Sequence, residues 1–414
     1  MKKPIYQIFL FIISWIYISN EAMGQVPDIQ WQTCLGGSSN DYCYTVKQTT
    51  DGGYILAGST TSADGNITIS HGNADAWIVK LSSDGNIQWQ RSFGGSFDDV
   101  AISIEQTMDG GYIFAGSTQS NNGDVSGNHG GYDVWVVKLS DTGSIQWQKV
   151  MGGPHDDLGQ SVIQTTDSSY IIAGYSNAVG GDVTINHGGS DFWIIKLSVS
   201  GTLQWQRSYG GSLEDYATSV LPAVDSGYIV AGYSFSSDGD LTLNRGNEDY
   251  WVIKLSPSGN LQWQRSYGGS GSDFAQSVVT TSDSCYIIAG GSNSTDGNIT
   301  GNIGHGDFWI IKLSSSGIIK WQKSFGGTND DAANSISKTS DGGYILGGWV
   351  SSNDGNVTGF HGSDDYWLVK ISSSGVIEWQ KPMGLLGVDV GWCAGETTDG
   401  GYIMAGYLSL IHIF

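Results

Sequence analysis

Residues 89–95 read Trp-Gln-Arg-Ser-Phe-Gly-Gly, and the Trp-Gln pair at their start decides the fold because it recurs at a fixed step. Each Trp of this kind follows the previous one by 58 residues, with no insertion or deletion. The seven copies are Trp31, Trp89, Trp147, Trp205, Trp263, Trp321 and Trp379. Long internal periods are typical of propellers, solenoids and repeat arrays.

One repeat predicts four strands, at residues 101–107, 112–117, 134–139 and 145–149. Asp109-Gly110-Gly111 lies between the first two, where Asp-Gly supplies the positive φ angles of a tight hairpin. The middle two strands are apolar on both faces, so both faces must be covered. Four-stranded sheets stacked radially around an axis meet that requirement, which predicts an all-β propeller.

The phase of the repeat predicts how the ring closes. Residues 29–32 form an isolated fourth strand, six full units follow from Asp41, and the seventh unit stops after Gly406 without its Asp-x-Trp third strand. We therefore expect a seven-bladed β-propeller of four-stranded antiparallel blades, with an incomplete seventh blade and an N-terminal strand closing the ring. Residues 408–414 match nothing in the repeat, and we interpret residues 407–414 as a non-native tail on a truncated chain.

Residues 1–24 are predicted to be an export signal. Lys2 and Lys3 precede the apolar run 5–18, and Ala22-Met23-Gly24 provides small residues for cleavage before Gln25. The run is shorter than the about 20 apolar residues that span a bilayer. We expect a propeller domain at residues 25–406, secreted or held on the outer cell surface, with no transmembrane segment after cleavage.

The composition excludes several classes of protein. A formal net charge of -22, from 40 acidic and 18 basic residues, disfavours a nucleic-acid partner. Hydrophobic residues make up 39% of the chain, which is enough for a core and argues against disorder. Four Cys in so long a chain are not a disulfide framework. Cys34 and Cys43 are close enough in sequence to bridge, and the sequence leaves their pairing open.

The repeat also resembles known families. Residues 138–147, Lys-Leu-Ser-Asp-Thr-Gly-Ser-Ile-Gln-Trp, are similar to the tryptophan-docking motif of quinoprotein propellers, and the order Gly-Tyr-Ile-x-Ala-Gly, Trp-x-x-Lys-Leu, Trp-Gln is similar to kelch blades. Residues 29–406 as a whole resemble the tandem-repeat exported propellers of the Bacteroidota, on Asp109–Ile113, His129–Gly131 and Trp89–Gly95. The resemblance implies a propeller fold and export, often with a type IX secretion sorting domain, and little about activity.

The long loop before the third strand carries oxygen-bearing side chains at regular positions. Such side chains suit a hard cation such as Ca²⁺, although the spacing is not that of an EF-hand. They equally suit loops in which Asn, Asp and Thr bind backbone groups, so both interpretations stay open. The calcium candidates are Asp64, Asn66, Asp75, Asp124, Asp133, Asp182, Asp191, Asp238, Asp240, Asp249, Asp296, Asp307, Asp354 and Asp365.

Other repeated charges are predicted to be structural. The connection between blades ends on an Asp, as at Asp41 and Asp99, and the third strand carries a Lys, as at Lys80 and Lys138. A buried Lys needs a carboxylate partner, so we expect ion pairs between these sets. His71, His129, His187 and His361 share one loop position, where we expect them to cap turns, since a ring spreads them too far apart to bind one metal.

The uniformity of the repeat argues against an enzyme, because catalysis needs unlike residues in unlike roles. We expect a monomeric, exported, non-catalytic module that binds a glycan, a protein or a cation on an acidic loop face, with no cofactor other than Ca²⁺. The alternative is a secreted polysaccharide hydrolase or lyase that uses carboxylates on the same face.

Overall fold

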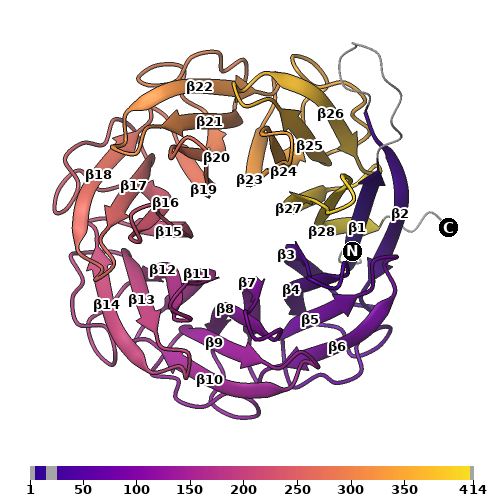
Figure 1. Ribbon diagram of the computed structural model, residues 1–414, viewed down its shortest axis with the longest axis vertical. Coiled ribbons are helices and arrows are strands. Elements are labelled where there is room, and N and C mark those ends of the chain that lie inside the picture. Colours follow the sequence, from indigo (N-terminus) through magenta and orange to yellow (C-terminus); the bar gives the residue numbers. More distant parts are fainter. Residues whose placement is uncertain (1–4, 15–25, 411–414) are drawn as a thin grey trace.

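The computed structural model describes residues 5–14 and 26–410 as antiparallel sheets arranged like blades around a central axis (Figure 1). In every sheet except the one that includes the chain's beginning, the strands follow chain order from the axis to the rim. The predicted all-β propeller with four-stranded antiparallel blades is confirmed. None of the described residues forms a helix long and apolar enough to cross a membrane.

Seven strands line the axis, and each is the first strand of a unit. They are β3 (Asp41–Gln48), β7 (Asp99–Gln106), β11 (Asp157–Gln164), β15 (Asp215–Pro222), β19 (Asp273–Thr280), β23 (Asp331–Lys338) and β27 (Asp389–Glu396). The second strands are β4 (Tyr54–Thr60), β8 (Tyr112–Thr118), β12 (Tyr170–Ser176), β16 (Tyr228–Ser234), β20 (Tyr286–Ser292), β24 (Tyr344–Val350) and β28 (Tyr402–Leu410).

Six units also supply a third and a fourth strand. The third strands are β5 (Asp75–Leu81), β9 (Asp133–Leu139), β13 (Asp191–Leu197), β17 (Asp249–Leu255), β21 (Asp307–Leu313) and β25 (Asp365–Ile371). The fourth strands, at the rim, are β6 (Ile87–Phe93), β10 (Ile145–Met151), β14 (Leu203–Tyr209), β18 (Leu261–Tyr267), β22 (Ile319–Phe325) and β26 (Ile377–Met383).

The seventh unit contributes only two strands, β27 and β28, so the prediction of a seven-bladed propeller is wrong. The repeat builds six blades and a two-stranded remainder. The chain's beginning extends this remainder, through β1 (Ile5–Ser14) and β2 (Asp28–Leu35), in the order β2-β1-β28-β27. The N-terminal strand β2 therefore pairs with β1 and not with a strand of the repeat.

Backbone hydrogen bonding explains the place of β1. It pairs with β28 from Ile5 opposite Leu410 to Ile13 opposite Tyr402, and on its other side it pairs with β2. Both neighbours would otherwise present unpaired backbone N–H and C=O groups. Residues 5–14 belong to the run interpreted as an export signal, and residues 407–410 end β28. Export and truncation stay predictions, and residues 411–414 lie outside the described residues.

The hydrophobic core lies between blades and not within them. One cluster joins Ile55 and Ile78 of the first blade to Phe114 and Trp135 of the second, and all four side chains are fully buried. Equivalent clusters lie at the other junctions. The second and third strands, which are apolar on both faces, are therefore covered on both sides, as the sequence predicts.

Each rim Trp attaches its blade to the next one. Trp89 of β6 packs against Tyr112 of β8, with ring centroids 5.8 Å apart, and covers Gly143 in the turn between β9 and β10. Gly143 has a φ of +77°, and a Cβ there would lie 2.9 Å from the indole Cζ3. Trp31 of β2 covers Gly85 in the same way, so the sheet that holds the chain's beginning is attached to the first blade by the same contact.

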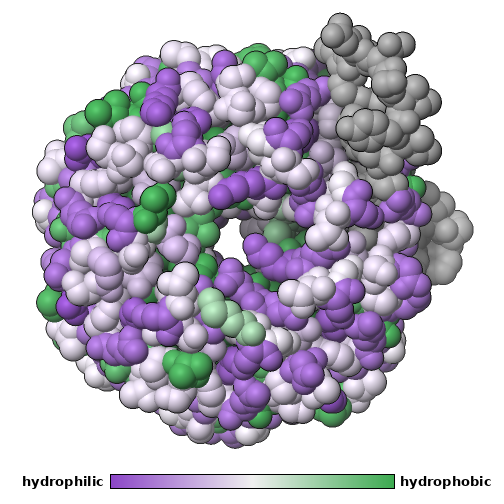
Figure 2. Space-filling view, in the orientation of Figure 1, coloured by the Kyte–Doolittle hydropathy of each residue, from purple (hydrophilic) through white to green (hydrophobic). Residues whose placement is uncertain are grey.

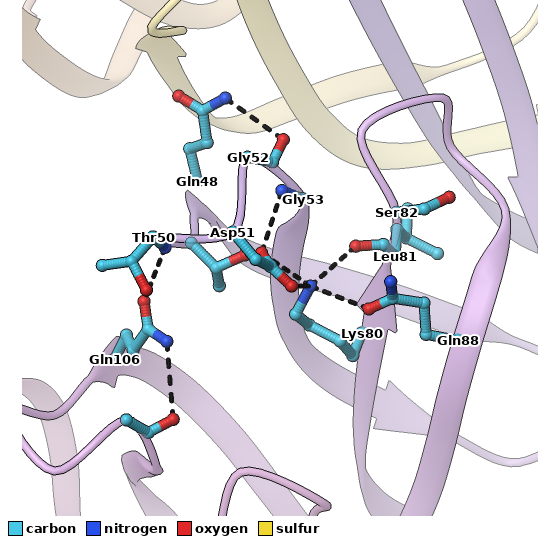
Figure 3. Close-up of polar contacts among 12 residues, drawn as sticks. Gln48, Thr50, Asp51, Gly52, Gly53, Lys80, Leu81, Ser82, Gln88 and Gln106 are labelled. Atoms are coloured by element: carbon cyan, nitrogen blue, oxygen red, sulfur yellow. Dashed lines mark hydrogen bonds and ion pairs between the residues drawn. The ribbon is translucent and has the colours of Figure 1, made fainter.

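The repeated Lys pairs with the hairpin turn and not with the Asp of the blade connection, which corrects our expectation. Lys80 Nζ donates to Asp51 at 2.8 Å, to the Leu81 carbonyl at 3.0 Å and to Gln88 at 3.0 Å (Figure 3). Partial burial acts to raise the pKa of Asp51, but Lys80 and the other hydrogen-bond donors lower it to about 2. On the neighbouring residue, the Thr50 N–H donates to Gln106 of the next blade at 2.8 Å (Figure 3).

The four Cys are free thiols, so no Cys34–Cys43 disulfide is present. Cys34 lies on β2 and Cys43 lies on β3, which belong to different sheets. Burial raises the pKa of both thiols, which makes them poor nucleophiles.

The contact between the Trp89 indole and Gly143 can be tested by replacing Gly143 with Ala. The variant must adopt a positive φ, which costs about 1 kcal/mol, and must displace Trp89, which costs about 1–3 kcal/mol more. Gly110→Ala is the matched control, because Gly110 has a φ of +83° but no atom near its missing Cβ. Denaturant titration should show a larger loss of unfolding free energy for Gly143→Ala. Equal losses of unfolding free energy in the two variants would contradict the role of the Trp89–Gly143 contact in joining the blades.

Candidate functional site

One end of the ring carries the long loops between second and third strands, together with the connections from each fourth strand to the next inner strand. We call this end the long-loop face. Residues 235–248 and 210–214 are one such loop and one such connection. This is the face on which the sequence predicts a ligand site.

The Asp that begins each inner strand holds the connection in place. Asp99 is fully buried, accepts the Gly95 N–H at 2.7 Å and the Ser120 hydroxyl at 2.8 Å, and also accepts the Thr118 hydroxyl. Three residues make the matching set of bonds, namely Asp41, Asp215 and Asp273. These carboxylates are structural and do not face a ligand.

The calcium candidates all bind backbone groups. One set accepts the N–H of a residue in the blade connection, at 2.6–2.8 Å, and consists of Asp64, Asp238, Asp296 and Asp354. A second set accepts a Gly N–H of that connection, at 3.0–3.4 Å, and consists of Asn66, Asp124, Asp182 and Asp240. The third set accepts the N–H of the residue four positions earlier and consists of Asp75, Asp133, Asp191, Asp249, Asp307 and Asp365.

Within residues 5–14 and 26–410, no three His, Cys, Asp or Glu side chains converge to hold a metal ion. Calcium binding stays a prediction from the sequence, and the arrangement favours its alternative, in which the oxygens satisfy loop N–H groups. We therefore expect a chelator to leave the melting temperature unchanged, since no bound ion would be stripped from the folded state. Differential scanning calorimetry with and without EDTA checks this, and a lower melting temperature with EDTA would restore the calcium interpretation.

The four His of the shared loop position do not meet one another. His129 Nδ1 lies 2.9 Å from Asp133, and its Nε2 lies 3.9 Å from Asp182 of the next unit. His187 Nδ1 lies 2.7 Å from Asp191. Each His thus stays beside the carboxylate that begins its own third strand, as expected for a residue that caps a turn.

Buried carboxylates also meet in pairs at the junctions. Asp307 and Asp331 are buried, and both lie against Gly326, closer than a Cβ there would allow. Oδ1 of Asp307 is buried and, among the described residues, accepts no hydrogen bond. Burial raises the pKa of Asp307 to about 7; the Ile303 N–H opposes the rise, and the charge of Asp331 adds to it. Five further Asp at this repeat position also have an unpartnered Oδ1, namely Asp75, Asp133, Asp191, Asp249 and Asp365.

These pairs make stability depend on pH. A carboxyl group with a raised pKa binds its proton more tightly in the folded chain, so its contribution is fully present below the unfolded pKa of about 4 and is lost as pH rises through the folded pKa. Burial raises the pKa of Asp157, Asp215 and Asp249 to about 6. We therefore expect the melting temperature to rise as pH falls from about 7.5 to 5.

Asp307→Asn isolates one pair. The amide is neutral at all pH values and can place an N–H beside Asp331, so the variant should be more stable than the parent by about 1–3 kcal/mol at pH 7.5, and by much less at pH 5. Asp331→Asn is the matched control. It should be destabilised at both pH values, because Asp331 accepts the Gly327 N–H and the Ser352 hydroxyl. A pH-independent loss in Asp307→Asn would contradict this account.

A hollow of about 360 Å³ opens on the long-loop face between the β15–β18 and β19–β22 blades. Its lining consists of Glu214, Tyr216, Tyr233, Phe235, Glu248 and Phe274. The Tyr216 and Tyr233 rings lie 5.2 Å apart, and the Tyr233 and Phe235 rings lie 6.4 Å apart. All six side chains are only half-buried, so a continuous aromatic surface faces solvent between two carboxylates.

Polar contacts fix one side of the hollow and leave the other open. Glu214 accepts the Ser190 N–H at 2.7 Å and the Tyr216 hydroxyl at 3.2 Å. Partial burial acts to raise the pKa of Glu214, but the hydrogen bonds from Ser190 lower it. Within the described part of the chain, the Glu248 carboxylate has no hydrogen-bond partner. Burial raises the pKa of Tyr233 to about 12, and Tyr216 and Glu248 add to the rise, so its hydroxyl remains a donor.

The hollow breaks the symmetry of the repeat. The position of Tyr233 is filled by Ser59, Ser117, Tyr175, Gly291, Trp349 and Tyr407 in the other units, and that of Glu248 by Ala74, Tyr132, Ser190, Gly306 and Asp364. Gly291 has a local reason, because Phe274 occupies the space of its missing Cβ. These residues are absent from the sequence-predicted candidates, although a comparison of units position by position would have marked them as variable.

Comparisons with known proteins do not assign an activity. No family model matches the chain. Over 257 residues, 55% of this chain, it is 27% identical to the regulatory protein FlaEY of Caulobacter vibrioides, of which it spans 26%. The chain thus covers about a quarter of that protein's length.

Solved structures that resemble this one differ widely in sequence. A protein of unknown function from Bacteroides caccae is 14% identical, with a TM-score of 0.44 over 76% of this chain and 93% of the other. The WD40 domain of Neurospora crassa Pan2 is 12% identical, with a TM-score of 0.48 over 90% of each chain.

Proposed function

We propose that this protein is a non-catalytic binding module that takes a glycan in the hollow of the long-loop face. The observation that carries the proposal is the group of four half-buried aromatic side chains beside Glu214 and Glu248, which line one hollow together. Aromatic rings stack on the apolar face of a pyranose, and convergent polar groups at the edge fix its orientation.

Each lining residue has a role in this proposal. Tyr216, held by Glu214, and Tyr233 form the stacking surface, while Phe235 and Phe274 extend it. The Tyr233 hydroxyl donates to the sugar, and the Glu248 carboxylate accepts from sugar hydroxyls. Such a charge-assisted bond is about twice as strong as a neutral one.

The module is proposed to act outside the cell. Support comes from Lys2, Lys3 and the apolar run 5–18, and from the resemblance of residues 29–406 to exported tandem-repeat propellers. Cleavage before Gln25 would remove β1 but leave β2, whose Trp31 is docked on the first blade.

A glycan array probed with the intact protein, followed by calorimetric titration of the best ligand, tests the proposal. Tyr233→Ala should weaken binding by about tenfold or more, because an aromatic contact worth about 1.4 kcal/mol corresponds to that factor. Glu248→Gln should weaken it less, since the amide keeps one acceptor oxygen. Ser117→Ala, at the position of Tyr233 in the second blade, is the matched control and should bind as the parent does.

Three results would overturn the proposal. One is the absence of any bound glycan on the array. Another is full affinity in Tyr233→Ala. The third is the release of reducing ends from a bound polysaccharide that ceases in Glu248→Gln, which would make the hollow the site of a hydrolase.

A further inference from the structure

The inner strands share a feature that the proposed function does not use. Each has a bulge near its middle, where the pairing with the second strand shifts register, for example between Ala101 and Ser103 and between Ala217 and Ser219. The same shift occurs in the other five inner strands. A bulge leaves one residue unpaired and redirects its side chain. Here seven redirected side chains surround the axis of the ring.

The residue after the bulge has a structural role. The Ser103 hydroxyl oxygen accepts the Val162 N–H of the next blade at 3.2 Å, and the Ser335 oxygen accepts the Ala394 N–H at 2.9 Å. Three further junctions have the same bond, from Ser161, Ser219 and Ser277. This ring of hydroxyls ties neighbouring inner strands together and is nearly uniform, as a structural contact should be.

The bulged residues differ from unit to unit. They are Tyr44, Ile102, Gln160, Thr218, Gln276, Asn334 and Trp392. All seven line a cavity of about 280 Å³ at the axis, and the opening is visible at the centre of the molecule (Figure 2). The variation shows that no single residue type is required at this position to hold the ring together.

The two sides of this axial cavity have different chemistry. Tyr44 of β3 and Trp392 of β27 pack edge to face with ring centroids 5.8 Å apart. The strands β11 and β19 lie across the axis from β3 and β27 (Figure 1), and they carry Gln160 and Gln276, which also line the cavity. One wall is therefore aromatic and the opposite wall carries amides.

The two Gln side chains are available to a ligand. Thr218 and Asn334 each donate to a carbonyl of the next blade, at 3.0 Å and 2.8 Å. In the described part of the chain, neither the Gln160 nor the Gln276 amide is hydrogen-bonded to protein, although both side chains are half-buried. An amide in a cavity without a protein partner requires water or a ligand.

Charge plays a small part in the cavity. Lys47 is the one charged residue in its lining. Glu105 lies near Lys47: burial raises the pKa of Glu105, and the charge of Lys47 opposes that rise. A ligand that matches this wall is uncharged, has one apolar face and carries hydroxyl or amide groups on its rim.

We propose that the axial cavity is a second binding site, which takes a single neutral sugar residue independently of the hollow on the long-loop face. Its volume is at the lower limit of ligand pockets, which suits one ring and not a chain. The sugar stacks on Tyr44 and Trp392 and exchanges hydrogen bonds with Gln160 and Gln276. With so few contacts, the dissociation constant is expected to be millimolar.

Saturation-transfer NMR of the intact protein with the methyl glycosides of glucose, galactose, mannose and N-acetylglucosamine tests this site. At least one glycoside should bind, and the Gln160→Ala/Gln276→Ala variant should bind it about tenfold more weakly. Gln276→Trp, which fills the cavity, should abolish binding. Gln119→Ala is the matched control, because it also removes a half-buried Gln amide but at a residue outside the cavity lining, and its affinity should match the parent's.

Tyr233→Ala separates this site from the hollow, and it should keep the affinity of the parent for the glycoside. The proposal is overturned if none of the four glycosides binds, or if the double Gln variant binds as the parent does. It is also overturned if Tyr233→Ala abolishes the signal, because the sugar would then occupy the hollow. A melting temperature equal to that of the parent confirms that the Gln variants are folded.

Discussion

The ring depends on one contact, in which the indole of a rim Trp lies on a glycine of the next blade. Both partners are constrained, because Gly143 must have a positive φ and must lack a Cβ where Trp89 lies. The hydrophobic core lies between blades, so a blade alone would leave apolar faces exposed. Each Trp–Gly contact therefore fixes the spacing at which two blades bury their shared core.

Most of the architecture could be predicted, because the same contacts recur in every unit and leave the same residues at the same step. The structure of the seventh unit could not be predicted in this way. The pattern ends after two strands, and nothing in the repeat indicates that residues 5–14 pair with the open edges of β28 and β2. Backbone hydrogen bonding is indifferent to sequence, so an apolar run without any repeat motif can fill such a place.

Side-chain partners were harder to predict than strands. The sequence offers Lys80 two repeated Asp, and only the strand register shows which one is near. Lys80 lies opposite Ile55, close to the hairpin turn that holds Asp51, whereas Asp41 is at the far end of its strand. The calcium candidates posed a similar ambiguity, since a carboxylate that binds a loop N–H has the same spacing as one that binds an ion. The hollow could not be predicted from the sequence, because its residues meet only in the folded chain. Three different strands supply Tyr216, Tyr233 and Phe274.

The formal charge of -22 overstates how acidic the long-loop face is. The Asp that begin the inner and third strands are buried, and burial raises the pKa of many of them, as at Asp99 and Asp307. At Asp307, whose pKa is raised to about 7, a bound proton removes part of this charge near neutral pH. The hairpin Asp, at the opposite end of the ring, are largely neutralised by Lys. The carboxylates that stay exposed on the long-loop face, such as Asp64 and Asp238, accept N–H groups of the blade connections and are thereby committed to the fold. Glu248 differs from them, because in the described part of the chain its carboxylate has no hydrogen-bond partner and both oxygens can accept from a ligand.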